Sequence, residues 1–412
     1  MALKYAPPLL VTAALVCGCD GDTAAGTTAQ PSAATTNKAL IEAPEDDDMG
    51  TDGGGEQHKG SVAAAGERAT IPAGQLVAGS TPGDKGRDPV FEPALLEAEL
   101  GAFEMDRLPY PNDPQQSPLT GVSRERAAKL CAEGQGRLCT ELEWERACKG
   151  PDQQPYAGGT RWDGSCGTAP ETCASGFGVL AMGAAMREWT ASEVLPIKKL
   201  QPQAAAIRGA GAEAAGVDHR CAHRAAIDPA TEAGDLGFRC CYGKANEPVI
   251  PSPGWLAAFR KADLPPTRLE QLFAASARLA PLAKDIKYFR EEAAIETIQR
   301  RGAARGTDAG APPPNMRMTT APTVWNPVPG EKIVLVTGRS ERDSFIVAFH
   351  RLSEDRYRVG AALIMKDEIG PVVFIYNPYV RRKLHWATCW ECYGATGNIT
   401  YRIDNRVVIT QK

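Results

Sequence analysis

The chain has 412 residues, of which 43% are hydrophobic and 23% are charged, which is the composition of an ordinary globular protein. The formal net charge of -4 gives no reason to expect nucleic acid or an acidic polymer as a partner. After the N-terminus no stretch reaches the roughly 18 apolar residues that a membrane-spanning helix needs, and the length is enough for two domains with additional segments.

Residues 1–18 have the pattern of a signal peptide. Lys4 precedes an apolar run over residues 6–16 that is too short to span a bilayer. The run ends in VCGC (16–19), which resembles the aliphatic residue, two small residues and cysteine of bacterial lipoprotein signals. We therefore expect cleavage before Cys19, lipid on its sulfur, and a protein anchored to the membrane of the cell envelope, on its periplasmic face or at the cell surface. The alternative is an ordinary secretory signal cleaved nearby, which would also export the chain.

The cysteine count agrees with export. The chain has 12 cysteines, and ten remain once Cys17 leaves with the signal peptide and Cys19 is lipidated. An even set in an exported protein indicates disulfides. The ten candidates are Cys131, Cys139, Cys148, Cys166, Cys173, Cys221, Cys240, Cys241, Cys389 and Cys392.

Composition divides the rest of the chain into five segments. Residues 19–68 are rich in Ala, Thr, Gly and Asp and have almost no aromatic residues, so they are predicted to be a disordered tether. Residues 69–245 have a globular composition with short regular elements, and residues 254–302 have a helical pattern. Residues 303–319 are predicted to be a linker, and residues 320–412 a β-rich domain.

The helical segment is predicted to contain two helices. In the first, Thr267 and Glu270 have the spacing of a capping box, and Leu269, Leu272 and Phe273 fall on one face. Pro281 is expected to interrupt the pattern. The second helix is predicted to run through Ile286, Phe289, Ala293 and Ile298 and to end at Gly302.

The C-terminal hundred residues consist of short β-rich runs separated by turn residues. The runs are KIVLVTGRS, DSFIVAFHRL, RYRVGAALIMK, GPVVFIYNPYV and NITYRIDNRVVITQ. In the last run Ile399, Tyr401 and Ile403 alternate with polar residues, and Asp404-Asn405 suits a tight hairpin turn. We expect a small antiparallel β domain with the helical segment packed beside it.

The stretch GRLCTELEWERACKG (136–150) predicts a capped helix. Thr140 and Glu143 form a capping box for a helix over residues 141–149, and Gly150 ends it. Upstream, GVSRERAAKLCAE predicts another short helix with Ser123 as its N-cap.

Nine segments follow one another from about residue 70 to residue 243 in an order typical of one family. They are TIPAGQLVAGS, LGAFEMDRLPYP, PLTGVSRERAAKLC, GRLCTELEWERACKG, YAGG, GFGVLAMGAAMREWTAS, IRGAG, RCAHR and GFRCC. Together they resemble the formylglycine-generating enzyme family, also called sulfatase-modifying factor proteins. The resemblance implies an α+β, C-type-lectin-like domain with little regular secondary structure, ahead of the helical segment and the small antiparallel β domain.

The resemblance does not extend to the catalytic cysteines. Catalytic members hold copper with two cysteines that lie about five and ten residues before the cysteine of Arg-Cys-Ala-x-Arg, which is Cys221 here. Those positions are Gly216 and Gly211, and no cysteine lies between Cys173 and Cys221. Because a copper-thiolate site needs soft sulfur ligands, we assign no catalytic residue and no cofactor.

A calcium site of the family is also weakened. Glu188 before Trp189 is retained, but the family's Asn or Asp positions are Ala181 and Ala185. Since calcium needs six to eight oxygen ligands, we expect no metal here and interpret Glu188 as a hydrogen-bonded structural residue.

Two histidines, His219 and His223, flank Cys221, with Arg208, Arg220 and Arg224 near in sequence. A His–Cys catalytic pair is one interpretation. The favoured one is a disulfide-bonded Cys221 with solvated histidines. The possible binding residues are therefore Glu188, Trp189, Arg208, His219 and His223. The family resemblance implies that Cys148 pairs with Cys240 or Cys241, and Cys221 with Cys166 or Cys173.

The C-terminal domain contains a Cys-x-x-Cys pair, Cys389 and Cys392. It could be a redox pair, half of a zinc site completed by His385 and His350, or a structural disulfide in a β turn. We favour the disulfide because the flanks are β-rich and no further ligands are near. The basic run YVRRKLHW (379–386) could bind an anionic surface, although such runs on edge strands more often prevent edge pairing.

The sequence favours a non-catalytic, membrane-anchored lipoprotein whose sulfatase-modifying-factor-like domain is a binding or assembly module for a protein or a glycan. That step is an analogy from the fold. The alternative is a metal-dependent oxidase or maturation enzyme of the same family with an altered active site. Relatives of this kind hold iron with histidines, and the five histidines here include no His-x-x-x-His pair on a predicted helix.

Overall fold

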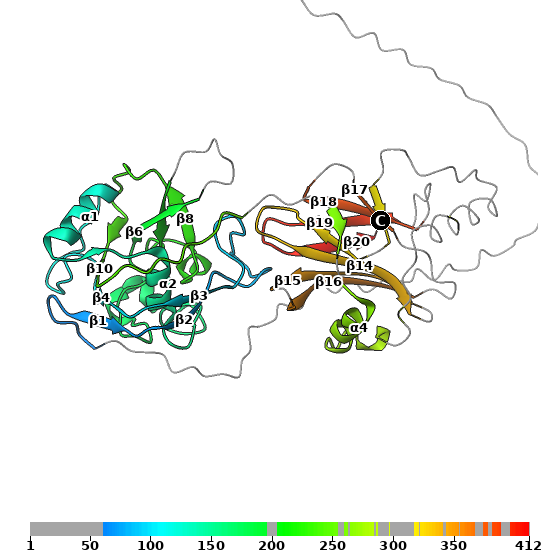
Figure 1. Ribbon diagram of the computed structural model, residues 1–412, viewed down its shortest axis with the longest axis horizontal. Helices are drawn as coiled ribbons and strands as arrows, with labels where there is room; N and C mark the ends of the chain where they lie inside the picture. The colour runs from blue at the N-terminus through cyan, green and yellow to red at the C-terminus, as the bar shows by residue number, and fades with distance from the viewer. Residues whose placement is uncertain are drawn as a thin grey trace, which may run out of the picture. The chain divides into compact units, whose positions relative to one another are not determined.

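The computed structural model contains two β-rich regions, shown in Figure 1. It describes residues 61–195, 204–253, 259–262, 264–283, 286, 296, 317–320, 322–340, 343–353, 355–366, 374–377, 381–388 and 396–411. None of the helices within these ranges is long and apolar enough to cross a bilayer.

The first region contains two four-stranded sheets and a hairpin. One sheet has the strand order β1-β4-β10-β5, the second has the order β8-β7-β6-β9, and the hairpin pairs β2 with β3. Only the β6–β9 pair is parallel among these described strands. The strands are β1 (Arg68–Ile71), β2 (Gly74–Ala78), β3 (Leu96–Leu100), β4 (Phe103–Asp106), β5 (Arg137–Leu138), β6 (Arg187–Val194), β7 (Ala204–Arg208), β8 (Arg224–Ile227), β9 (Leu236–Phe238) and β10 (Cys240–Tyr242).

Two helices pack with these strands, and both begin where the sequence predicts. Helix α1 (Arg124–Glu133) begins after Ser123, whose side chain accepts a hydrogen bond from the backbone N–H of Arg126. Helix α2 (Glu141–Lys149) has the predicted capping box of Thr140 and Glu143. Three shorter helical turns are α3 (Ser165–Thr168), η1 (Pro170–Thr172) and η2 (Gly216–His219). The expected mixed architecture with few helices is therefore confirmed for this region.

Helix α2 is the centre of the first region, because all nine of its residues are buried. Leu142 packs in one apolar cluster with residues of β2 and β3, and Trp144 in another with residues of β1 and β4. The same helix carries five charged residues, so its burial requires that each charge be paired.

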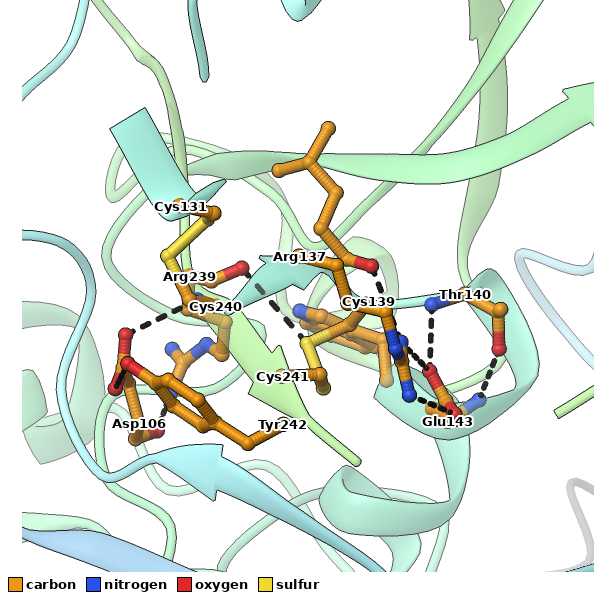
Figure 2. The surroundings of a disulfide bond; sticks show 12 residues. Asp106, Cys131, Arg137, Cys139, Thr140, Glu143, Arg239, Cys240, Cys241 and Tyr242 are labelled. Carbon is orange, nitrogen blue, oxygen red and sulfur yellow. Dashed lines mark hydrogen bonds and ion pairs between the residues drawn. A yellow bond between two sulfur atoms is a disulfide. The ribbon is translucent and has the colours of Figure 1, made fainter. Parts of the chain in front are cut away.

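Four disulfides join the first region, and Figure 2 shows two of them side by side. Cys240 and Cys241 are neighbours on β10, and adjacent strand residues point to opposite faces of a sheet. Cys240 therefore bonds to Cys131 of α1, and Cys241 bonds to Cys139, which directly precedes the cap of α2. The two bridges fasten both faces of β10 to different elements.

The disulfide pairings implied by the family resemblance are wrong. Cys148 bonds to Cys221 rather than to the β10 cysteines, because both sulfurs lie in the core around Trp144. Cys166 and Cys173 bond to each other across the short turns α3 and η1. Cys389 and Cys392 lie outside the described residues.

The second region is a sandwich of two antiparallel five-stranded sheets. Their strand orders are β11-β13-β14-β15-β16 and β12-β17-β18-β19-β20. The strands are β11 (Phe259–Lys261), β12 (Arg317–Thr319), β13 (Thr323–Trp325), β14 (Ile333–Ser340), β15 (Asp343–Arg351), β16 (Tyr357–Lys366), β17 (Phe374–Asn377), β18 (Lys383–Ala387), β19 (Thr396–Tyr401) and β20 (Val407–Gln411). The predicted antiparallel β domain is confirmed.

Strand β14 shows how the first of these sheets is covered on both faces. Ile333 and Leu335 point into the core between the sheets, which also contains Trp386. Val334 and Val336 point the other way and pack with Leu269 and Phe273. These last two residues belong to helix α4 (Pro266–Ala274), which together with η3 (Ala280–Leu282) covers the outer face.

The capping box predicted for α4 is wrong. The N-cap is Pro265 without a side-chain hydrogen bond, and Pro266 occupies the first turn, so Thr267 already lies inside the helix. Proline is preorganised for the first helical position, and here it decides where the helix begins. The expected interruption at Pro281 falls in η3. The predicted second helix, through Ile286, Phe289, Ala293 and Ile298 to Gly302, falls largely outside the described residues.

Two expectations for the sandwich strands need correction. Ile399 and Tyr401 are buried as predicted, but Ile403 lies in the turn after β19 and is 92% exposed. The basic run of residues 379–386 leads into β18, which pairs with both β17 and β19 and is therefore a central strand. Its positive charges consequently do not protect a sheet edge.

A loop between β2 and β3 contacts the sandwich. The guanidinium of Arg87 donates to the carboxylate of Glu331 at 2.5 Å, and both side chains are fully buried. Nδ1 of His350 lies 2.8 Å from the other oxygen of Glu331. Arg358 pairs with Asp84 of the same loop at 2.9 Å.

Candidate functional site

The segment that carries catalysis in the resembled family lies against α2 and is held by buried ion pairs. Nη2 of Arg208 lies 3.0 Å from Glu145 and 3.3 Å from Glu141. Arg224 donates to both oxygens of Glu141, at 2.8 Å for Nη2 to Oε1. Arg208 also donates to the carbonyl of Cys221 at 3.4 Å. These arginines fix the chain between β7 and β8 and are turned away from solvent.

The charges of α2 are paired on its remaining sides. Lys149 contacts Glu145 at 2.9 Å and donates to the carbonyls of Val77 and Gly79. Burial alone would raise the pKa of Glu145, but the positive charges of Lys149 and Arg208 outweigh it and lower that pKa. The acidic residues of the GRLCTELEWERACKG stretch are thus structural ion-pair partners.

Glu188 and Trp189 are also internal. Glu188 accepts hydrogen bonds from Nε1 of Trp144 at 3.0 Å and from both Nε and Nη2 of Arg239 at 2.7 Å. Trp189 donates to the carbonyl of Val122. Both Glu188 oxygens are used in this way, and Ala181 is apolar and buried where the family has an oxygen ligand. These residues do not fit a calcium ion.

His219 belongs to an aromatic stack. Its ring lies 3.8 Å from the ring of Trp162 with an interplanar angle of 9°. Its Nδ1 lies 2.7 Å from the carbonyl of Gly183, and its Nε2 lies 3.2 Å from that of Ala214. The expectation that His219 is solvated is therefore wrong. Because both nitrogens are used and the residue is 2% exposed, it is not free to bind a ligand.

The two copper-ligand positions of the family do not fit a copper-thiolate site here. Gly211 and Gly216 supply no sulfur, and a Cβ built on Gly216 would lie 2.8 Å from Cδ1 of Trp162. The indole ring therefore occupies the space that a side chain at residue 216 would need. The sequence revealed the missing cysteines, whereas the role of Trp162 depends on a stack formed across 57 residues of chain and had no local signal.

His223 differs from the other predicted binding residues. Its side chain is partly exposed, and its Nδ1 is a buried atom with no hydrogen-bond partner among the described residues. Burial is the main cause that lowers the pKa of His223, while Glu92 and Asp218 oppose it. The neighbouring Cys221 is disulfide-bonded to Cys148, so the two cannot form a His–Cys catalytic pair.

A surface groove of about 770 Å³ lies beside α1, where the sequence indicated no site. Its lining includes the small apolar residues Ala128, Ala132, Ala191, Ala230 and Ala245. Ala128 and Ala132 are on one face of α1 and are exposed. Small side chains leave room for an incoming chain, which larger residues at the same positions would fill.

Charged residues of both signs border the groove, and its two arginines are fixed by hydrogen bonds. Arg124 donates through Nε to the carbonyl of Thr190 at 2.9 Å and through Nη2 to that of Ser192 at 3.3 Å. Arg137 makes a bidentate pair with Glu143, at 2.7 and 2.8 Å, which Figure 2 shows. The groove therefore has an apolar floor and a border that also contains Glu125 and Glu232.

The Glu143 carboxylate predicts an acid-sensitive element of stability. Burial would raise its pKa, but hydrogen bonds from Arg137, Thr140 and Asn246 outweigh it and lower the pKa below 4.5. A lowered folded-state pKa gives stability that is present above the unfolded-state pKa and is lost as the pH falls through the folded-state pKa.

We expect Glu143→Gln to be less stable than the parent by about 1–3 kcal/mol at pH 7, because a charge-assisted pair is lost. The difference should shrink progressively below pH 4.5, the pKa of an unperturbed glutamate. Urea unfolding at pH 7, 5, 4 and 3 measures it. If the difference in the free energy of unfolding between the two proteins stayed the same at all four pH values, the lowered pKa assigned to Glu143 would be contradicted.

Comparison with known proteins agrees with the geometry of the first region. Residues 98–243 match the family model described as "Sulfatase-modifying factor enzyme 1-like domain", which confirms the family expected for this domain. A comparison with curated proteins finds no match.

Three solved structures are similar to part of the chain. PvdO from Pseudomonas aeruginosa is 16% identical with a TM-score of 0.36, and the alignment covers 45% of this chain and 98% of PvdO. CarF is 15% identical with a TM-score of 0.33, and the alignment covers 43% of this chain and 97% of CarF. Treponema denticola variable protein 1 is 15% identical with a TM-score of 0.34, and the alignment covers 44% of this chain and 98% of the variable protein.

Proposed function

We propose that this chain is a non-catalytic, lipid-anchored protein of the cell envelope whose sulfatase-modifying-factor-like domain binds a protein partner. The observation that carries the proposal is the state of the family's catalytic segment. Its two sulfur positions are Gly211 and Gly216, and Trp162 fills the space beside the second. Its arginines, Arg208 and Arg224, are committed to glutamates of α2.

The location of the protein has independent support. Four disulfides indicate an extracytoplasmic compartment, because thiols are kept reduced in the cytosol. The lipid on Cys19 is the finer proposal and rests on the VCGC pattern at residues 16–19. It would hold the domain at a membrane. The tether predicted for residues 19–68 is wrong over its last part, because Ala63 is buried and β1 begins at Arg68; the rest of it lies outside the described residues.

The groove beside α1 is the surface that we assign to the partner. A floor of alanines accepts a chain that approaches closely, and Arg124, Glu125 and Glu232 at its border can contact polar groups of that chain. A glycan would instead be expected to stack on an exposed aromatic ring, and no aromatic residue lines the described groove. These features favour an extended protein segment over a glycan.

Photo-crosslinking in the native cell tests this assignment. A photoreactive amino acid at Ala132, inside the groove, should give a protein adduct. The same group at Lys129, which is exposed on α1 but outside the groove lining, should not. Ala128→Trp, which fills the groove, should reduce the Ala132 adduct. Equal adducts at both positions would contradict the assignment, and an adduct lost on glycan cleavage would reassign the partner as a glycan.

An enzyme of the same family with an altered active site is the second candidate, and His223 is the observation that favours it. A partly exposed histidine with an unpartnered Nδ1 and a lowered pKa could accept a proton or bind a metal. Elemental analysis of the purified full chain distinguishes the candidates. We expect no stoichiometric copper, iron or zinc, whereas one bound transition metal that is lost in His223→Gln would favour the enzyme.

A further inference from the structure

Two turns lie side by side at one end of the sheet that contains β18, β19 and β20. The backbone N–H of Tyr401 donates to the carbonyl of Arg382 at 2.8 Å, and Lys383 of β18 pairs in register with Thr400 of β19. Residues 402–406 then turn the chain into β20, where Val407 pairs with Tyr401. Residues 381–383 and 402–406, here called the basic tip, therefore form one continuous surface.

An aliphatic side chain projects from the basic tip. Ile403 is 92% exposed, whereas Tyr401 and Val407 on either side of the turn are buried. The turn is closed by a hydrogen bond from the N–H of Arg402 to the carbonyl of Arg406 at 2.9 Å. The hydroxyl of Tyr401 also donates to Asn405 at 2.8 Å. These bonds hold Ile403 outward, so its exposure is a fixed property of the turn.

Cationic residues flank Ile403 in the basic tip. The tip contains five cationic residues and one carboxylate; the cations are Arg381, Arg382, Lys383, Arg402 and Arg406. The carboxylate is Asp404, which contacts Arg406 at 2.7 Å and Arg402 at 3.6 Å. Other acids near the tip have partners: Glu331 is paired with Arg87 and Asp84 with Arg358, and Asp88 accepts from the backbone N–H of Val90. The tip itself is therefore basic, whereas the whole chain has a net charge of -4.

We propose that the basic tip docks on an anionic phospholipid surface. Arginines bind headgroup phosphates, and an exposed aliphatic side chain at the same tip can enter the boundary between headgroups and acyl chains. A soluble polyanion would use the cations but would gain nothing from Ile403. The combination of both features in one turn therefore favours a lipid surface, and it assigns the sandwich a membrane contact separate from the N-terminal lipid.

Vesicle sedimentation of the full chain tests the proposal. We expect tighter binding to vesicles of phosphatidylcholine with 30% phosphatidylglycerol, on the order of a typical anionic leaflet, than to pure phosphatidylcholine. The double variant Arg382→Glu/Arg402→Glu should weaken anionic-vesicle binding by at least about tenfold, since each cation near the surface contributes about fivefold. Salt at about 0.5 M should have the same effect, because it shortens the Debye length to about 4–5 Å and so screens the charges of the tip.

Ile403→Ser separates a lipid surface from other anions, because it removes the aliphatic side chain without changing the charge. It should weaken binding to anionic vesicles by about tenfold, the value of a buried aliphatic side chain. The matched control is Val62→Ser, because Val62 is also apolar and 91% exposed but lies outside the basic tip. It should leave binding unchanged. Near-ultraviolet circular dichroism confirms that each variant is folded.

Three results would overturn the proposal. The first is equal binding of the parent chain to neutral and anionic vesicles, which would mean that the N-terminal segment alone binds the membrane. The second is an Ile403→Ser variant that binds like the parent. The third is competition by heparin in the parent and Ile403→Ser alike, which would identify the basic tip as a site for soluble polyanions.

Discussion

Replacing Glu141 with alanine is expected to lower the free energy of unfolding by about 3–5 kcal/mol, the usual cost of removing one partner from a buried ion pair. Glu141 accepts from both Nε and Nη2 of Arg224 and also contacts Arg208. The side chains of all three are at most 2% exposed. Without the carboxylate, Arg224 loses its ionic partner in the interior, and Arg208 retains Glu145 as its ionic partner within the described residues. Chemical denaturation followed by tryptophan fluorescence measures the loss.

The neighbouring helix offers a matched control. Glu133 of α1 forms an ion pair with Arg126 at 3.8 Å, but both side chains are more than half exposed. Glu133→Ala should therefore change stability by no more than about 1 kcal/mol. Similar losses in the two variants would mean that the Glu141 network does not hold the segment between β7 and β8. That outcome would weaken the view that the family's catalytic segment has become structural in this protein.

The features that the sequence predicted well are local ones. The capping box of Thr140 and Glu143 needs only four residues, and α2 begins and ends where the pattern places it. Ser123 capped α1 for the same reason. The alternation of the last run placed Ile399 and Tyr401 in the core correctly, because neighbouring strands on both sides maintain the period of two. Local rules fail at Ile403, where the strand has already ended.

The features that sequence analysis missed depend on contacts between distant segments. Cys148 and Cys221 are 73 residues apart, and only the packing around Trp144 brings them together. The groove beside α1 combines residues from α1, β5, β6 and later loops, so no single stretch carries its pattern. One signal for the filled catalytic position was present. Gly216 is a glycine where the family has a larger residue, which indicates that another group, here the ring of Trp162, lies close to the backbone.

Removing both bridges of β10, Cys131–Cys240 and Cys139–Cys241, by alanine substitution is expected to destabilise the protein more than removing Cys166–Cys173. The β10 bridges join segments that are 109 and 102 residues apart, whereas Cys166 and Cys173 are 7 residues apart. Both must be removed together, because either one alone already closes the long loop and leaves only a short ring for the other. In the chain-entropy model, with Cys148–Cys221 intact, the expected losses are about 5–7 kcal/mol against about 2–3 kcal/mol. Guanidinium unfolding of the two variants compares bonds of the same chemistry within one protein.

The order of the two losses also tests how the groove is held. Cys131 lies on α1, which forms one wall of the groove, and Cys240 lies on β10, which pairs with β5 on the other side. Loss of the β10 bridges should therefore lower both stability and the Ala132 crosslink, whereas loss of Cys166–Cys173 should leave the crosslink intact. If both variants retain the crosslink, the packing of Leu130 and Leu138 in the core beneath α1 is sufficient to hold the groove. If removal of the 7-residue bridge costs more stability, the entropy of the unfolded chain does not set the contribution of these disulfides. Packing around the sulfurs in the native state would then set it.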